Sequence, residues 1–286
     1  MNNNSQNNSH SNILVRKASG ESQPFSTKKL IASLERAGAD FDVIDHIVSD
    51  VHSWLTNGVS TKKIYDRAFS LLRSNKYATA SRYGLKKAIL EMGPTGYPFE
   101  HLISKVMELD GYTTQTGIVV DGFSVTHEVD VIATKNKQQV LVECKYGQSA
   151  GRIVSVKVPL YIHSRVNDIV RKRQTMPEFE GFTFQGGIAT NTRFTTDAID
   201  YAKCYNLWLL AWDYPVGKGL KDIIDREKIY PITVLNSITK AQKQQLMDNG
   251  VVICRQIVDE PKVLDRLQLN YRKLNELLNE TKNICN

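Results

Sequence analysis

Several features that would assign this chain to a specialised class of protein are missing from its 286 residues. No stretch approaches the roughly 18 consecutive apolar residues that a membrane helix needs, so we predict no membrane span and no membrane partner. The four cysteines are scattered without a CxxC pair or a neighbouring pair of histidines, which argues against a disulfide framework and a zinc site. The first twelve residues are polar rather than a signal sequence, so we interpret 1–12 as a disordered tail. These absences favour a cytoplasmic protein with reduced thiols.

What the sequence does have is an excess of basic residues. The 37 lysines and arginines exceed the 30 acidic residues and give a net charge of +7, which suggests a polyanionic partner. The excess is uneven, because residues 96–214 hold 13 acidic against 12 basic side chains while both flanking segments are net positive. A site for a divalent cation needs surplus carboxylates, so we expect it in this middle segment. The run Arg171-Lys172-Arg173 could also grip phosphates, although a solvated helix face is the alternative.

Apolar periodicity divides the chain behind the tail into three parts. Residues 13–95 begin with a short predicted β-hairpin and continue as four amphipathic helices. A break at Gly93-Pro94-Thr95-Gly96 ends this domain, and 96–214 follows as a second domain. Residues 215–286 return to helical periodicity. The fold class that we predict is a multidomain α+β protein, with helices around a small mixed sheet in the middle domain.

The order of elements in the middle domain is predicted as αβββαβαβ. Its first helix carries apolar residues at helical spacing and ends at Asp110-Gly111. Three β-like segments follow, at 112–120, 123–134 and 138–146. After a helix near 158–175, the last elements are a strand, a helix and an apolar strand, at 183–190, 194–205 and 207–212.

Acidic residues and a lysine stand on two neighbouring strands of this predicted sheet. Strand periodicity puts Glu128 and Asp130 on one face of the second strand, and it puts Glu143 and Lys145 on one face of the third. A buried Glu or Lys is costly without a partner, and a divalent cation is such a partner. Two carboxylates on Mg²⁺ or Mn²⁺ can hold a scissile phosphate, while a nearby ammonium stabilises developing charge and helps to orient or deprotonate water. The alternative is a plain ion pair at the strand end, but the preceding helix contributes a further acid, Glu100.

Four segments around these residues resemble the restriction endonuclease-like superfamily of the PD-(D/E)xK kind, particularly Mrr-like enzymes and archaeal Holliday-junction resolvases. The segments are GYPFEHLISKVMELDGY, HEVDVIA, VLVECKY and the Mrr-like ending GGIATNTRFTTDAIDYAKCYNLWLLAWD. The resemblance implies that Asp130 and Glu143 bind the metal, that Lys145 is the catalytic lysine, and that Glu100 is an accessory acid. The residue two before the key Asp departs from the usual pattern, which leaves open whether it also reaches the metal. The possible accessory residues are Glu128 and Gln148.

The N-terminal domain resembles the ATP-cone, a regulatory domain of many ribonucleotide reductases. The resemblance is carried by ILVRKASGESQPFSTKKLIASLERAG, VHSWLTNGVSTKKIYDRAFSLL and YATASRYGLKKAI, and it implies that ATP or dATP binds as a regulatory ligand. Lysines near a helix start can converge on phosphates. The chain departs from the family at Ala18, where a basic residue is usual, so a degenerate cone kept as a scaffold is the alternative. The nucleotide contacts implied by position are Val15, Lys17, Ser26, Lys29, Thr61 and Lys87.

The sequence therefore predicts a nucleotide-regulated, metal-dependent endonuclease that acts on DNA, in restriction or in repair. The main alternative is a non-catalytic, nucleotide-dependent DNA-binding regulator, and a third is an oligomerising sensor. The C-terminal region is distantly similar to helix-hairpin-helix modules, although a helical cap or a dimerisation element fits its periodicity equally well. The nuclease resemblance also implies a homodimer, since cutting two strands takes two sites.

Overall fold

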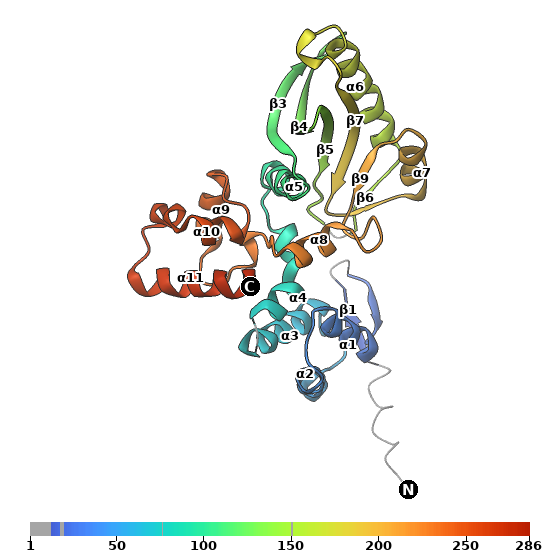
Figure 1. Cartoon of the computed structure of the whole chain (residues 1–286). Coiled ribbons are helices and arrows are strands. Elements are labelled where there is room, and N and C mark those ends of the chain that lie inside the picture. The colour runs from blue at the N-terminus through green and yellow to red at the C-terminus, as the bar shows by residue number, and fades with distance from the viewer. Residues whose placement is uncertain (1–12, 18–19, 76, 150) are drawn as a thin grey trace. The chain divides into compact units, whose positions relative to one another are not determined.

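The computed structural model describes residues 13–17, 20–75, 77–149 and 151–286 (Figure 1). These residues fold into two compact units, one ending at Leu85 and the other beginning at Lys86. Among the described helices, none combines the length and the apolar character that crossing a bilayer requires. The predicted tail at 1–12 and the departure from the cone pattern at Ala18 lie outside the described residues.

The first unit consists of a β-hairpin followed by helices, as the sequence predicts. The elements are β1 (Leu14–Arg16), β2 (Ser22–Pro24), α1 (Thr27–Arg36), α2 (Phe41–Trp54), α3 (Thr61–Asn75) and α4 (Tyr77–Leu90). The hydroxyl of Ser26 caps α1 by accepting from the backbone N–H of Lys29 at 3.3 Å. Apolar side chains at helical spacing, such as Leu30 and Leu34 of α1, pack with Ile47 of α2 in one core. The last element, α4, begins in this unit and ends in the second.

The second unit is built on a five-stranded sheet of order β3-β4-β5-β7-β9 (Figure 1). The strands are β3 (Thr113–Asp121), β4 (Thr126–Lys135), β5 (Gln138–Lys145), β7 (Thr183–Thr190) and β9 (Trp208–Leu210). The first three form an antiparallel meander, whereas β7 and β9 run parallel to β5. The mixed sheet expected for the middle domain is thus confirmed.

Helices cover this sheet. They are α5 (Tyr97–Leu109), α6 (Lys157–Arg173) and α7 (Thr196–Cys204). Helix α5 packs on β3 and β4, α6 packs on β7, and α7 lies beside α6 and β9. Consecutive residues of β5 at Val140, Leu141 and Val142 are all buried, and because neighbouring side chains point to opposite faces, both faces of the sheet are covered.

The regular alternation along β4 is interrupted at Asp130. Strict alternation would place Val129 and Ile132 on opposite faces, yet both belong to the core that contains Ile162 of α6. The register between β3 and β4 sets Gly117 opposite Asp130, and this glycine has a φ of 61°. The period-two pattern that the sequence suggests therefore does not hold through Asp130, because the sheet is distorted at this level.

The rest of the second unit consists of one short pair of parallel strands and several helices. The helical C-terminal region that the sequence predicts is thus confirmed. The elements are β6 (Ile153–Val154), β8 (Arg193–Phe194), α8 (Leu220–Glu227), α9 (Lys240–Asp248), α10 (Cys254–Asp259), α11 (Tyr271–Cys285) and the 3-10 helices η1 (Pro177–Phe179), η2 (Ile232–Val234) and η3 (Pro261–Leu267). Strands β6 and β8 pair in parallel. A buried carboxylate ties α11 to the chain before α9, since Glu280 accepts from the backbone N–H groups of Asn236 and Ser237 at 2.8 and 2.9 Å.

Candidate active site

The acidic residues that the sequence predicts on the two strands, Asp130 and Glu143, lie close together where the pairing of β4 with β5 ends. Backbone pairing of the two strands runs through Ile132 with Leu141 and Val131 with Val142, so continuing the register brings Asp130 level with Glu143. At this level the Asp130 carboxylate accepts from the backbone N–H of Cys144 at 2.7 Å. A side chain has thus taken over a hydrogen bond to β5 where the regular β4–β5 pairing ends. The structure brings the two predicted metal ligands together.

Two basic side chains hold Glu143. Its carboxylate accepts from Lys145 Nζ through one oxygen and from Arg165 Nη1, at 2.5 Å, through the other. The side chains of Glu143 and Arg165 are each 11% exposed, whereas that of Lys145 is 40% exposed. Glu143 is therefore a nearly buried carboxylate with compensated charge, and Lys145 reaches solvent. The ion pair considered as the alternative from the sequence is present.

Glu100 joins this group from the first turn of α5. Burial, followed by the negative charges of Asp130, Glu128 and Glu143, raises the pKa of Glu100 to about 7. Burial and the charge of Glu143 likewise raise the pKa of Asp130 to about 6, against the opposing effect of the Cys144 N–H. The four carboxyl groups thus form one electrostatic cluster.

The cluster has the chemistry of a divalent-cation site. Neighbouring negative charges raise the pKa of Glu100 and of Asp130, and a shared cation would offset that repulsion, while oxygen donors are the ligands that Mg²⁺ and Mn²⁺ favour. Across the described residues, however, no three carboxylate, histidine or cysteine side chains are already arranged as a ligand set. Glu143 would have to exchange an ion pair for a metal bond. Asp130 and Glu143 are the residues that could hold the ion, with Glu100 beside them.

The two accessory candidates occupy different surroundings. Glu128 is exposed on β4 and contributes negative charge to the environment of Glu100. Gln148 instead donates its side-chain amide to the carbonyl of Pro94 at 2.8 Å. That amide ties the end of β5 to the linker before α5, and its role in metal or substrate binding stays a prediction.

Sequence reasoning missed two residues that touch the site. Arg165 has a nearly buried side chain on α6, three residues after Ile162 and four before Ile169 of the apolar core. A charge inside an apolar stripe is the signal that could have identified it. Tyr146 follows Lys145 and donates its hydroxyl to the carbonyls of Ile89 and Leu90 at 3.1 and 2.8 Å. Nothing in the local pattern indicates this contact, because its partners lie more than fifty residues away.

The basic run at the end of α6, which the sequence suggests could bind phosphates, differs from residue to residue in its surroundings. Arg173 is 5% exposed, donates to the side-chain oxygen of Gln139, and lies 4.8 Å from the ring centroid of Phe179. The prediction that Arg173 contacts phosphate is therefore wrong, because its guanidinium is buried against the Phe179 ring and the Gln139 side chain. Arg171 lies over the ring of Phe123 at 3.6 Å, in the turn between β3 and β4.

Only some of the residues predicted to contact a nucleotide lie near one another in the structure. Strand β1 bridges to the start of α3 through Arg16 and Ser60, which places Lys17 and Thr61 at neighbouring positions. Lys17 is paired with Glu21 at 2.9 Å. Val15, with an exposure of 2%, is a core residue, so its side chain faces away from solvent. Lys29 is exposed in the first turn of α1, which Ser26 caps, and Lys87 is exposed on α4 beyond the unit boundary.

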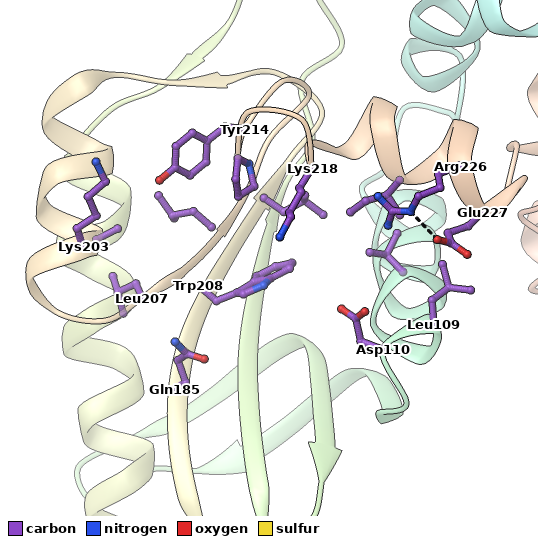
Figure 2. Close-up of a pocket in the computed structure, with 16 residues that line it drawn as sticks. Leu109, Asp110, Gln185, Lys203, Leu207, Trp208, Tyr214, Lys218, Arg226 and Glu227 are labelled. Atoms are coloured by element: carbon purple, nitrogen blue, oxygen red, sulfur yellow. Dashed lines mark hydrogen bonds and ion pairs between the residues drawn. The ribbon is translucent and has the colours of Figure 1, made fainter.

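A cavity of about 680 Å³ lies apart from the carboxylate cluster. It opens along β9, between the end of α5 and the second half of α8. Figure 2 shows Trp208 among the lining side chains, with Lys218 and Asp110 nearby and the Arg226–Glu227 ion pair at one end. The lining includes neither the acidic residues nor the lysine of the candidate active site, so this hollow is a separate feature of the domain.

Family models match three consecutive parts of the chain. An ATP cone domain matches residues 13–88, a restriction endonuclease domain of the Mrr type matches 91–213, and an AF1548-like C-terminal domain matches 230–285. The protein is therefore an ATP-cone domain joined to a restriction endonuclease-like domain, which confirms both resemblances drawn from the sequence.

Similar proteins and solved structures identify a family within the restriction endonuclease-like class. An uncharacterized protein of Archaeoglobus fulgidus is 31% identical over 183 residues, which are 64% of this chain and 99% of that protein. The crystal structure of AF1548, a protein of unknown function, matches with 30% identity and a TM-score of 0.56 over 67% of this chain and 98% of that one. The MspJI restriction endonuclease, solved in complex with a 27-mer oligonucleotide, has 16% identity and a TM-score of 0.36 over 70% of this chain and 39% of its own. The chain belongs to the AF1548-like family.

Proposed function

We propose that this protein is a divalent-metal-dependent endonuclease that hydrolyses phosphodiester bonds of DNA under the control of an adenine nucleotide. One observation carries the proposal. The carboxylates of Asp130 and Glu143 lie level with each other beside Lys145, where β4 separates from β5, and they are close enough to Glu100 to raise its pKa, inside a domain that matches a restriction endonuclease family. Foreign-DNA restriction and DNA repair are the processes that such an activity would serve.

The residues of the chain divide the chemical work. A Mg²⁺ or Mn²⁺ ion held by Asp130 and Glu143 would supply positive charge to the scissile phosphate. Lys145 extends to solvent, so its ammonium can contact the phosphate, stabilise the charge that develops there and orient the attacking water. Glu100, with a pKa of about 7, can hold or release a proton near neutral pH. Arg165 keeps the Glu143 carboxylate in place.

Control is assigned to the ATP-cone. ATP or dATP would contact Lys17 and Thr61, which the bridge between β1 and the start of α3 brings near each other, together with Ser26 and Lys29 at the start of α1. The remaining positions, Val15 through its backbone and Lys87 on α4, complete the proposed set. A homodimer would supply the two active sites that a double-strand cut needs.

The decisive experiment is cleavage of supercoiled and linear DNA by the purified protein, with Mg²⁺ or Mn²⁺ and with or without ATP or dATP. Lys145→Ala should reduce the rate about 100-fold or more, because a charge-stabilising donor is lost. Lys203→Ala is the matched control, since Lys203 is an exposed lysine on α7 of the same domain. Undiminished cleavage by Lys145→Ala would remove the mechanism.

A specific observation favours a second candidate, a nucleotide-dependent DNA-binding regulator without catalysis. Glu143 is already neutralised by Lys145 and Arg165, and the described residues hold no ready ligand set for a metal. In that case the wild-type protein would bind DNA in the same assays and cut none of it with either metal. Saturable binding without product is the result that selects the regulator.

A further inference from the structure

Three basic residues surround Trp212 and Asp213, just beyond the end of β9. Lys86 Nζ lies 5.9 Å from the ring centroid of Trp212. The backbone N–H of Lys221, on α8, donates to the carbonyl of Trp212 at 3.2 Å. Arg193, in β8, donates its Nε to Asp213 at 3.0 Å. These contacts define a basic cluster of Lys86, Arg193 and Lys221, which we name the edge cluster.

The edge cluster carries more positive than negative charge, and that charge faces solvent. It combines three cations with the carboxylate of Asp213, and the Arg193 side chain is 65% exposed. Lys86 is also exposed and Lys221 is half-buried. Partial burial of this group, and then the charge of Arg193, lower the pKa of Lys86, with Lys221 acting in the same direction and Asp213 against it. Like charges held together in this way are stabilised by an anion.

The edge cluster lies at the edge of the sheet that carries the candidate active site. The parallel register pairs Lys145 with Thr190 and Ala189 with Leu210. Arg193 follows β7, the neighbour of β5, and Trp212 follows β9, the next strand beyond β7, so both stand at the carboxyl ends of strands on this side of β5. Neighbouring strands are about 4.8 Å apart, which puts the cluster on the order of 10 Å from β5, roughly three nucleotide steps along a duplex axis.

The geometry points to the edge cluster as a binding site for the phosphate backbone of DNA, next to the candidate active site. This assignment rests on the proposed function, because it takes DNA as the substrate. Contacts to phosphates fix the register of a protein on a duplex without reading its sequence. The edge cluster therefore holds the strand that Asp130, Glu143 and Lys145 cut, and it contributes affinity for any sequence.

The test is the salt dependence of DNA binding, measured by fluorescence anisotropy with a labelled duplex and Ca²⁺ in place of Mg²⁺. Each lost phosphate contact reduces the slope of log affinity against log salt by about 0.9. The variant Lys86→Gln/Arg193→Gln/Lys221→Gln should therefore lose about 2 to 3 of that slope. Lys203→Gln, at an exposed lysine in the last turn of α7, before the amino end of β9, should keep the wild-type slope. If the triple variant unfolds, Arg193→Gln alone should lose about 0.9 and Arg193→Lys nearly none.

Calorimetry with ATP separates the two sources of phosphate. Wild-type affinity for ATP in the triple variant, with a reduced DNA slope, supports the assignment. An unchanged DNA slope overturns it, and so does a fall in ATP affinity at an unchanged slope, because the cluster would then serve a nucleotide. Failure of the wild-type protein to bind DNA at all overturns the proposed function together with this assignment.

Discussion

Arg165 shows how one buried residue sets the state of the candidate active site. Its guanidinium and the Glu143 carboxylate are each 11% exposed, so neither charge is well hydrated. A buried ion pair is weak support for stability as a whole, but removing one partner leaves the other charge uncompensated. Lys145 remains as a second partner of Glu143, which limits that penalty.

Replacing Arg165 should therefore destabilise the protein and free Glu143 for a metal. For Arg165→Leu we expect a loss of roughly 1 to 3 kcal/mol in the free energy of unfolding, because Glu143 keeps one cation. Added Mn²⁺ should raise the Tm of this variant by more than it raises that of the wild type. Thermal unfolding with and without Mn²⁺ measures both effects, and Arg193→Gln, at an exposed arginine, is the control. An equal response to Mn²⁺ in all three proteins would contradict the competition between Arg165 and the metal.

The raised pKa values of Glu100 and Asp130 make the site sensitive to pH. Without a cation, these carboxyl groups bind protons in the folded protein up to about pH 7 and about pH 6, above their ordinary range in an unfolded chain. The folded state then binds more protons than the unfolded state between about pH 4 and 7, so the stability of the metal-free protein falls as pH rises through this window.

Cation binding should show the opposite dependence. The ligands must be ionised to bind a metal, so affinity for Mn²⁺ should fall as pH drops from about 8 to about 6, and binding near pH 6 should release protons. Calorimetry in two buffers of different ionisation enthalpy counts the protons. Glu100→Gln should reduce the number released near pH 7. The same affinity at both ends of this range would rule out these carboxylates as the cation site.

At the scale of elements, hydrogen bonds join the end of α4 to the residue that follows β5. The hydroxyl of Tyr146, the residue after Lys145, donates to two carbonyls in the last turn of α4. The ring of Tyr146 also lies 5.7 Å from that of Phe99, the neighbour of Glu100. Because α4 begins in the unit that matches the ATP cone, a shift of this helix would act on the strand that carries Lys145.

Removing this hydroxyl should separate regulation from cleavage. Tyr146→Phe keeps the ring and loses the hydrogen bonds, at a cost of about 1 kcal/mol in stability. We expect cleavage without nucleotide to stay within about twofold of the wild type, while the change in rate on adding ATP or dATP is reduced. Rates measured over a nucleotide titration give the comparison, and Tyr201→Phe on α7 is the matched control. A full nucleotide response in Tyr146→Phe would exclude this route of coupling.

The elements themselves were predictable, whereas the details that shape the site were not. Long amphipathic patterns, such as the apolar face of α5 and the apolar run at Val140 to Val142, indicate helix and strand from the sequence because periodicity is a local property. The distortion at Asp130 depends on Gly117 in another strand and on the backbone of Cys144. The pairing of Arg165 with Glu143 depends on how α6 crosses the sheet. Such contacts join distant parts of the chain, and no local pattern encodes them.

At the scale of the whole molecule, the chain joins an ATP-cone domain to a restriction endonuclease-like domain. The family models match these domains to residues 13–88 and 91–213, and the boundary between the two compact units falls within α4. Proteins that share a fold can differ in their binding sites or lack them, so the cone fold alone does not establish nucleotide binding.

Nucleotide binding by the cone should depend on Lys29. This side chain is exposed in the first turn of α1, where the amino end of the helix favours an anion, and a charged contact to phosphate contributes about 1.5 to 3 kcal/mol. Lys29→Ala should therefore weaken ATP binding about 10-fold or more by calorimetry. Lys28→Ala is the matched control, since Lys28 is the preceding exposed residue of the same helix and is not among the predicted contacts. Saturable binding in the wild type that both variants retain would move the site away from α1, and no saturable binding in the wild type would leave the cone as a scaffold without a ligand.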